Sequence, residues 1–295
     1  MLRTATLLVT SFFLCAASFA QQTFLDAAVN GTQVVYDLSN TGQQLLYAQQ
    51  FGIYPSTGTF ASVSSVAEVG ALGASVTASS IPPVEAGKSI EGKITISTTV
   101  QNGDDFTIGA PGRTSQDEGT FNALLSLGGS LANGPGSGTF YAESADISYT
   151  AQFNPGISGG GKLYQGQYGI SNSSSGPTQH GGISSPIAVT VPFIFGQPIA
   201  IALTLNVDAS ADSVSDSTES GLASAAAQFF NTFKWDGITS VTDSTGANVS
   251  NYTVTSVSGF NYELPAPEPV PEPATWFLAL SGIAAIAIWP RIVGP

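Results

Sequence analysis

Cysteine, methionine and histidine are almost absent, with one of each in a chain of 295 residues. Cys15 lies in the first 20 residues, a segment that we expect to be removed on export, so the mature chain would hold no disulfide and no cysteine metal site. A zinc site usually needs more than one His or Cys ligand. The sequence therefore predicts neither a metal ligand set nor a cofactor.

Charge is also scarce: 9% of the residues are Asp, Glu, Lys or Arg, against about 25% in an ordinary soluble domain. Acidic residues number 20 and basic residues 7, for a formal net charge of −13. Binding to nucleic acid needs clustered Lys and Arg on the phosphates, so nucleic acid is excluded as a partner. The 33 Gly and 17 Pro favour short strands and turns over helices.

The first 20 residues have the three parts of a secretory signal peptide. Arg3 precedes an apolar run over residues 7–17, and Ser18 and Ala20 are small residues before Gln21. We expect a signal helix over residues 1–20 and cleavage by signal peptidase between Ala20 and Gln21. The alternative is a short core helix that begins the fold.

The C-terminal segment has a second ordered pattern. A proline-rich spacer over residues 265–275 leads into an apolar run over residues 276–289, which ends at Trp289 and is followed by Arg291. Trp276 and Trp289 bracket this run as interfacial anchors do. The spacer ends in a short motif: Pro271, Glu272, Pro273, Ala274, Thr275 and Trp276.

This order of spacer, PEP motif, apolar helix and cation closely resembles the PEP-CTERM sorting signal of Gram-negative bacteria. The resemblance implies recognition and cleavage by a membrane-embedded exosortase, and an association with exopolysaccharide and biofilm matrix. Two features depart from the family pattern. Arg291 stands alone where the family has an arginine cluster, and the 14 residues of the run rise about 21 Å against a bilayer core of about 30 Å. The alternative is a buried or amphipathic C-terminal helix.

Residues 21–264 form the expected body, which we interpret as one domain. Several runs alternate apolar and polar side chains with the period of a half-buried strand. We predict an all-β fold, an antiparallel β-sandwich of jelly-roll type. The strand-like runs cover residues 31–37, 88–100, 137–153, 199–207 and 241–262, the last with a hairpin turn near its start.

Other local features interrupt this pattern. A change of phase near Ala145 predicts a bulge, and the Asn-Gly-Asp-Asp sequence at residues 102–105 predicts a turn. Helical patterning is weak, and two segments could hold a helix: residues 43–50, and residues 220–230, which fit a long strand equally well.

The body offers few groups for chemistry. His180 lies in a Gly/Ser-rich stretch, and we interpret it as a solvated loop residue because a catalytic triad needs a positioned imidazole. A paired carboxylate site of a glycoside hydrolase stays open as a minor alternative. Four acidic residues could bind calcium, although a solvated, flexible loop fits their spacing better: Asp208, Asp212, Asp216 and Glu219. The pairs Asp104–Asp105 and Asp117–Glu118 are interpreted in the same way.

The aromatic residues lie mostly in strand-like runs, where they are expected to fill the core. The sequence thus predicts a non-catalytic, exported protein of the cell envelope or extracellular matrix, anchored in the membrane at least transiently through residues 276–289. The alternative is a carbohydrate-binding module for matrix polysaccharide, which would expose two or more aromatic rings on one face. A secreted glycan-active enzyme is a third reading.

Overall fold

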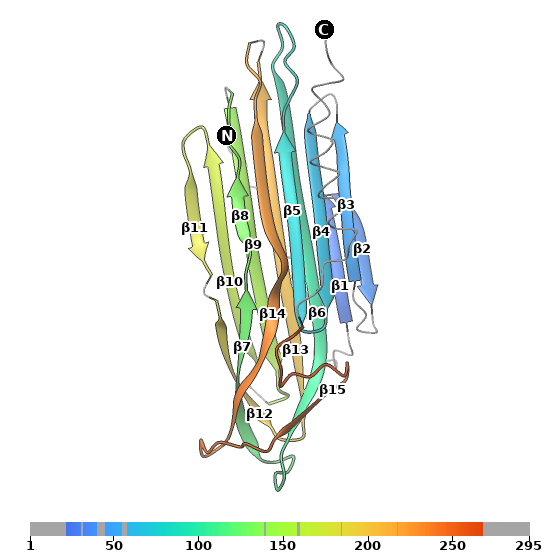
Figure 1. The fold of residues 1–295 in the computed structure, drawn as a ribbon, viewed down its shortest axis with the longest axis vertical. Coiled ribbons are helices and arrows are strands. Elements are labelled where there is room, and N and C mark those ends of the chain that lie inside the picture. Colours follow the sequence, from blue (N-terminus) through green and yellow to red (C-terminus); the bar gives the residue numbers. More distant parts are fainter. Residues whose placement is uncertain are drawn as a thin grey trace.

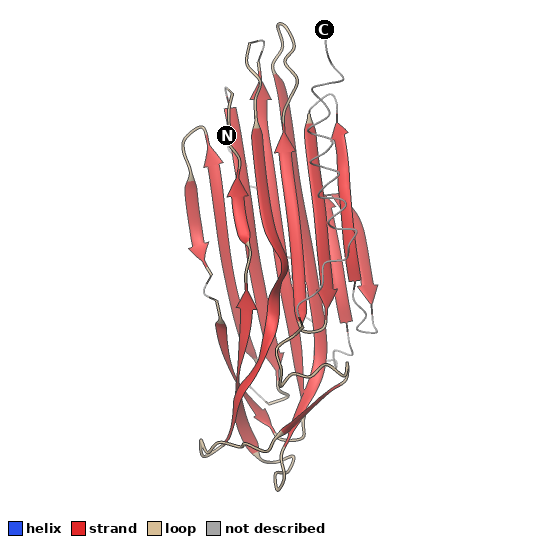
Figure 2. Ribbon diagram, viewed as in Figure 1, coloured by secondary structure: helices blue, strands red, loops and turns tan. Residues whose placement is uncertain are grey.

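The computed structural model describes residues 22–30, 32–39, 45–54, 58–138, 140–157, 160–183, 185–216 and 218–267. Within these ranges every regular element is a strand, as Figure 2 shows, and all strand pairs are antiparallel. The expected all-β, antiparallel fold is therefore confirmed. The signal helix and the membrane helix fall outside the described residues.

The strands form two sheets whose strands run along the long axis of the molecule (Figure 1). The first sheet, sheet A, has the order β11-β10-β9-β13-β6-β1-β2, and β15 pairs with β6 beside β1. Its strands are β1 (Gln22–Val29), β2 (Thr32–Ser39), β6 (Ile90–Gly109), β9 (Phe140–Asn154), β10 (Lys162–Ser173), β11 (Thr178–Gly182), β13 (Pro198–Ser215) and β15 (Thr253–Ser256).

The second sheet, sheet B, has the order β12-β7-β14-β5-β4-β3, and β8 also pairs with β14. Strands β5 and β4 of this sheet pack against β6 and β13 of sheet A. Its strands are β3 (Leu45–Tyr54), β4 (Thr59–Glu68), β5 (Ala71–Ser80), β7 (Glu118–Leu127), β8 (Ser130–Asn133), β12 (Ile187–Ile194) and β14 (Ala223–Asp243).

One hydrophobic core lies between the sheets, and period-two alternation builds it. On β13 the odd-numbered residues from Ile199 to Val207 are at most 1% exposed, whereas their even-numbered neighbours face outward. The aligned strand β9 contributes Ile147, Tyr149 and Phe153 to the same layer. Such alternation is what one buried face and one solvated face require.

The pairing of the central strands is nested. β5 pairs with β14, β6 with β13, β7 with β12, and β9 with β10. In chain order, the first of these eight strands pairs with the last, the second with the seventh and the third with the sixth. The two middle strands, β9 and β10, form a hairpin. Loops 81–89 and 174–177 lie at the upper end of Figure 1, and loops 110–117 and 244–252 lie at the lower end.

Three local predictions were wrong. The described part of the possible helix at residues 43–50 belongs to β3, which pairs with β4 over its length. The predicted turn at residues 102–105 lies inside β6, where all four residues are buried. The predicted bulge near Ala145 is absent, because β9 keeps one continuous register with β13. The phase change arises because Phe140 and Ala142 lie on the outer face, whereas Ala145 and the following odd residues face the core.

The open alternative at residues 220–230 is resolved, and the interpretation of the acidic stretch as a flexible loop was wrong for Asp208 and Asp212. Residues 223–230 are strand, since β14 begins at Ala223. The acidic stretch is not a flexible loop from Asp208 onward, because β13 continues to Ser215 and carries Asp208 and Asp212 on its outer face. Only Asp216 and Glu219 lie in the following turn, where Asp216 accepts hydrogen bonds from the Thr218 and Glu219 amides.

The small side chains of Ala223, Ala225 and Ala227 on β14 face the core.

Candidate functional site

The outer face of sheet A is lined by small polar side chains that hydrogen-bond across the strands. Thr99 on β6 donates to Asn206 on β13, and Asn206 donates to Ser148 on β9. Ser144 and Ser210 form a second cross-strand bond of 2.8 Å. These two networks pair five hydroxyl and amide side chains of this face with one another. Within this face, one row of residues carries titratable groups.

His180 and Asp146 meet in that row although a whole strand separates them. His180 lies on the edge strand β11 and Asp146 on β9, with Gly169 of β10 in register with both. The imidazole Nε2 lies 2.9 Å from Asp146 Oδ1. A Cβ atom at position 169 would stand 1.9 Å from Asp146 Oδ1 and 2.3 Å from His180 Cε1. The missing side chain of Gly169 therefore makes this contact possible.

Asp208 is the next residue in the row, directly opposite Asp146. Like charges in opposed positions of a sheet destabilise it. Burial and then the charge of Asp146 raise the pKa of Asp208 to about 6. Burial also raises the pKa of Asp146, while the charge of His180 and its hydrogen bond act in the opposite direction. The row thus holds two coupled carboxyl groups and one imidazole.

In this row, the Asp208 carboxyl, with its pKa of about 6, is the group that burial and the neighbouring Asp146 bring closest to neutral pH. Ser171 and Thr178 face the same side of β10 and β11, and their hydroxyls hydrogen-bond to each other at 2.6 Å. In the described part of the chain, no group of three or more His, Cys, Asp or Glu side chains is placed to hold a metal ion. The prediction that His180 lies in a loop was wrong, because His180 lies on β11. Its contact with Asp146 was not predicted.

The second notable arrangement ties the C-terminal segment to the core. Asp104 is fully buried on β6, and its carboxylate accepts hydrogen bonds from the Ser258 hydroxyl, the Ser258 amide and the Tyr262 hydroxyl. Burial raises the pKa of Asp104, and these hydrogen bonds act against that increase. The prediction of a solvated acidic pair at 104–105 was therefore wrong, since both residues are at most 7% exposed.

Tyr262 extends this attachment into the aromatic core. Its ring stacks on Phe106 at 4.6 Å between centroids and lies edge-on to Trp235 at 5.4 Å. The Trp235 indole donates to the Tyr262 carbonyl at 2.8 Å, and the Ala266 amide donates to the Trp235 carbonyl at 2.7 Å. We call residues 257–266 the C-terminal strap. The strap joins β15 of sheet A to β14 of sheet B.

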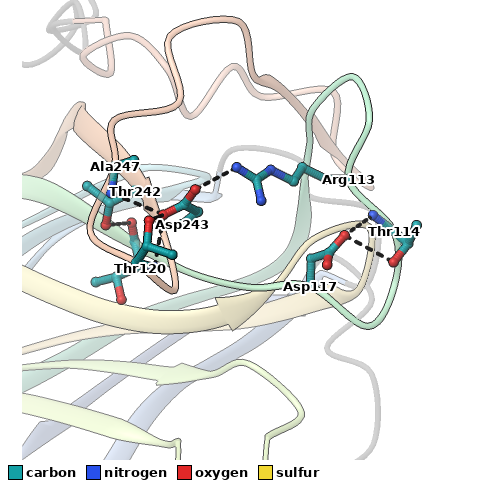
Figure 3. A network of polar contacts seen from close by, with 8 residues as sticks. Arg113, Thr114, Asp117, Thr120, Thr242, Asp243 and Ala247 are labelled. Atoms are coloured by element: carbon teal, nitrogen blue, oxygen red, sulfur yellow. Dashed lines mark hydrogen bonds and ion pairs between the residues drawn. The ribbon is translucent and has the colours of Figure 1, made fainter.

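A third polar network holds the loops at the lower end (Figure 3). Arg113 of the β6–β7 loop pairs with Asp243 at 2.6 Å, at the end of β14. The Thr245 side chain lowers the pKa of Asp243 to about 2, with further contributions from Arg113 and the amides of Ala247 and Thr245. Asp117 accepts from the amide and hydroxyl of Thr114 within its own loop. These contacts order the loops. A turn is present at 243–248 and closes on one isolated bridge between Thr242 and Asn248, but the predicted hairpin is not formed, because β14 and β15 belong to different sheets.

The aromatic residues occupy the positions that the core interpretation predicted. Phe121, Phe153, Phe193, Phe195, Phe233 and Trp235 are at most 1% exposed. Phe140, at 42%, is the one exposed ring among the residues whose burial the structure describes, and Tyr141, Tyr164 and Tyr168 are half-buried against the core.

The residues of the sorting and cleavage predictions lie outside the described ranges: Ala20, Gln21, the motif over 271–276, Trp289 and Arg291. In the ranges that are described, no helix has the length and apolar character to cross a membrane. Comparison of the chain with protein-family models, curated proteins and solved structures finds no match in any of the three.

Proposed function

We propose that this chain is an exported, non-catalytic protein of the cell envelope or extracellular matrix, sorted through its C-terminal PEP motif. The observation that carries the proposal is the strap. Among the described residues, Ala266 is the last that is hydrogen-bonded into the body, and the proline-rich sequence continues from that point. A proline-rich spacer favours an extended conformation. A processing enzyme needs an extended segment at its recognition motif, and the composition of the spacer before 271–276 favours one.

We further infer that the body is a β-sandwich of jelly-roll type. A jelly roll is a double sheet of eight strands made from two Greek keys. The nested pairs β5·β14, β6·β13, β7·β12 and β9·β10 support this topology. Strands β1–β4 extend the two sheets at one side. Because a fold alone does not define an activity, this topology adds nothing to the functional assignment by itself.

The proposal favours a structural role over a carbohydrate-binding module or a glycan-active enzyme. The large aromatic rings that are buried in the core, and not offered to a ligand, support that preference. The expected partners are signal peptidase and an exosortase as processing enzymes, and the membrane through residues 276–289. Matrix exopolysaccharide remains the partner of the alternative function.

Cell fractionation tests the proposal in a Gram-negative host that carries an exosortase. The wild-type chain should leave the inner membrane, whereas a triple variant, Pro271→Ala, Glu272→Ala and Pro273→Ala, should stay in the membrane fraction. The matched control is Pro269→Ala, which changes the spacer and leaves the motif intact. Identical distribution of the wild type and the triple variant would refute sorting through this motif.

A further inference from the structure

A buried carboxylate without a cationic partner lies between the sheets at their upper end. Glu143 on β9 is 2% exposed and faces the interior. Oε1 accepts the Ser224 amide of β14 at 3.2 Å, and the Asn172 side chain also hydrogen-bonds to the carboxylate. Oε2 is buried and has no hydrogen-bond partner. Acidic side chains are rarely buried to this extent unless they are paired.

No basic side chain of the described residues compensates this charge. Lys88 pairs with Glu85, Lys93 with Asp212, and Arg113 with Asp243. Lys162 is in register with Phe153, which stands ten residues along β9 from Glu143, or about 33 Å. Lys234 stands ten residues along β14 from Ser224. The carboxylate therefore needs another source of positive charge or a proton.

A second buried oxygen without a partner stands beside the same point of β14. Asn133 on β8 faces the interior, and its Oδ1 is buried with no hydrogen-bond partner. Asn133 is in register with Ala225, and the next amide, that of Gly134, donates to the Ser224 carbonyl at 2.7 Å. Glu143 and Asn133 therefore both adjoin Ser224, one from each sheet. Each has a buried oxygen without a hydrogen-bond donor, which a cation placed between them would satisfy.

We propose that Glu143 and Asn133 bind a small hard cation of the calcium type between the two sheets. Carboxylate and amide oxygens are the ligands that such cations prefer, and calcium completes its coordination with backbone oxygens and water. The bound ion satisfies both oxygens at once and balances the buried charge. The Asn172 amide, which hydrogen-bonds to the carboxylate, holds Glu143 in place. With one carboxylate, the affinity falls in the weak class of about 10⁻⁴–10⁻³ M that extracellular modules show.

The competing explanation is a proton on Glu143. Burial raises the pKa of this carboxyl, and a protonated Glu143 would itself be a donor. The two explanations predict different effects of calcium and of Glu143→Gln. If Glu143 carries a proton, the neutral glutamine amide replaces it with little loss of stability. If Glu143 binds a cation, the glutamine removes the charge that the cation site requires.

The test is the melting temperature of the purified exported chain at pH 7 in EDTA, in 5 mM CaCl₂ and in NaCl of equal ionic strength. Calcium should raise the wild-type melting temperature by about 2–9 °C over both other conditions, according to where the affinity lies in this class. Glu143→Gln should abolish this increase. The matched control Glu85→Gln, an exposed carboxylate in the loop that follows β5, should keep it.

Asn133→Asp should strengthen calcium binding, in contrast to Glu143→Gln. It adds a second carboxylate, and calcium affinity in such sites increases with ligand charge. The calcium dissociation constant, obtained from the dependence of the melting temperature on calcium concentration, should fall by about tenfold. A wild-type chain that does not respond to calcium, a Glu143→Gln variant that still responds, or an Asn133→Asp variant with unchanged affinity would overturn the proposal. An increase in stability of Glu143→Gln in EDTA without any calcium response would assign the proton instead.

Discussion

The Tyr262 hydroxyl donates a hydrogen bond of 3.0 Å to the Asp104 carboxylate, across 158 positions of the chain. Asp104 has no exposed surface and Tyr262 has 1%. A buried carboxylate is tolerated when its oxygens accept hydrogen bonds. The strap supplies these donors, so the C-terminal segment and the middle of β6 stabilise each other.

Tyr262→Phe should destabilise the body. It keeps the ring that stacks on Phe106 and removes one donor from Asp104, and leaving a buried acceptor short of a partner costs about 1–3 kcal/mol. Urea unfolding followed by circular dichroism measures this change. Tyr168→Phe, which removes a phenol from a half-buried position of β10, is the control and should cost less. Equal losses for the two variants would argue against the strap as a specific attachment.

Asp208→Asn should stabilise the body at pH 7. The pKa of Asp208 is about 6 in the folded protein against an ordinary value of 3.8, so the folded state binds this proton more tightly than the unfolded state. The contribution of this group to stability is complete below about pH 4 and is lost as the pH rises through about 6. Replacing Asp208 by asparagine removes this loss, so the free energy of unfolding at pH 7 should increase by as much as about 3 kcal/mol. Unfolding free energies at pH 4.5 and 7.5 measure the difference between the two proteins.

Asp212→Asn is the matched control for this experiment, because Asp212 lies on the same face of β13 and pairs with Lys93 at 3.4 Å. It should not raise the stability at pH 7. If Asp208→Asn leaves the pH dependence unchanged, Asp208 does not titrate near pH 6.

Gly169→Ala should separate His180 from Asp146, since the new Cβ would overlap both side chains. The edge strand β11 would lose its side-chain link to β9. Amide hydrogen exchange should then accelerate over residues 178–182, because local opening of an edge costs little free energy. Gly182→Ala has open space around the new Cβ and should leave exchange in the preceding residues unchanged. Unaltered exchange in Gly169→Ala would show that the contact does not hold β11.

Thr245→Val should raise the pKa of Asp243 from about 2 by more than Arg113→Ala does, because the Thr245 side chain is the largest cause of the lowered pKa. A depressed pKa means that this carboxylate stabilises the fold above about pH 4 and that the contribution is lost as the pH falls through about 2. Carboxyl chemical shifts recorded against pH measure both variants. A larger effect of Arg113→Ala would reverse the assigned order.

Period-two patterning was sufficient to predict the antiparallel β architecture, because strands such as Ile199–Val207 bury every second side chain. It failed where tertiary contacts outweigh local preference. Asn102 and Asp104 have turn-forming side chains, yet Asn102 donates to the Glu68 carbonyl and Asp104 accepts from the strap, so β6 passes straight through them. The contact of His180 with Asp146 could not be predicted, since it depends on the register of three strands and on a glycine between them. The export and sorting predictions stay predictions, because their residues lie outside the described ranges.

The central claim is that the chain is exported and then cut at its C-terminal motif. Its most direct test is the intact mass of the surface-located protein from a host that carries an exosortase. The account predicts a chain that begins at Gln21 and lacks the apolar run 276–289, whereas the triple alanine variant at 271–273 keeps that run. A wild-type protein that retains both Met1 and residues 276–289 would contradict the account.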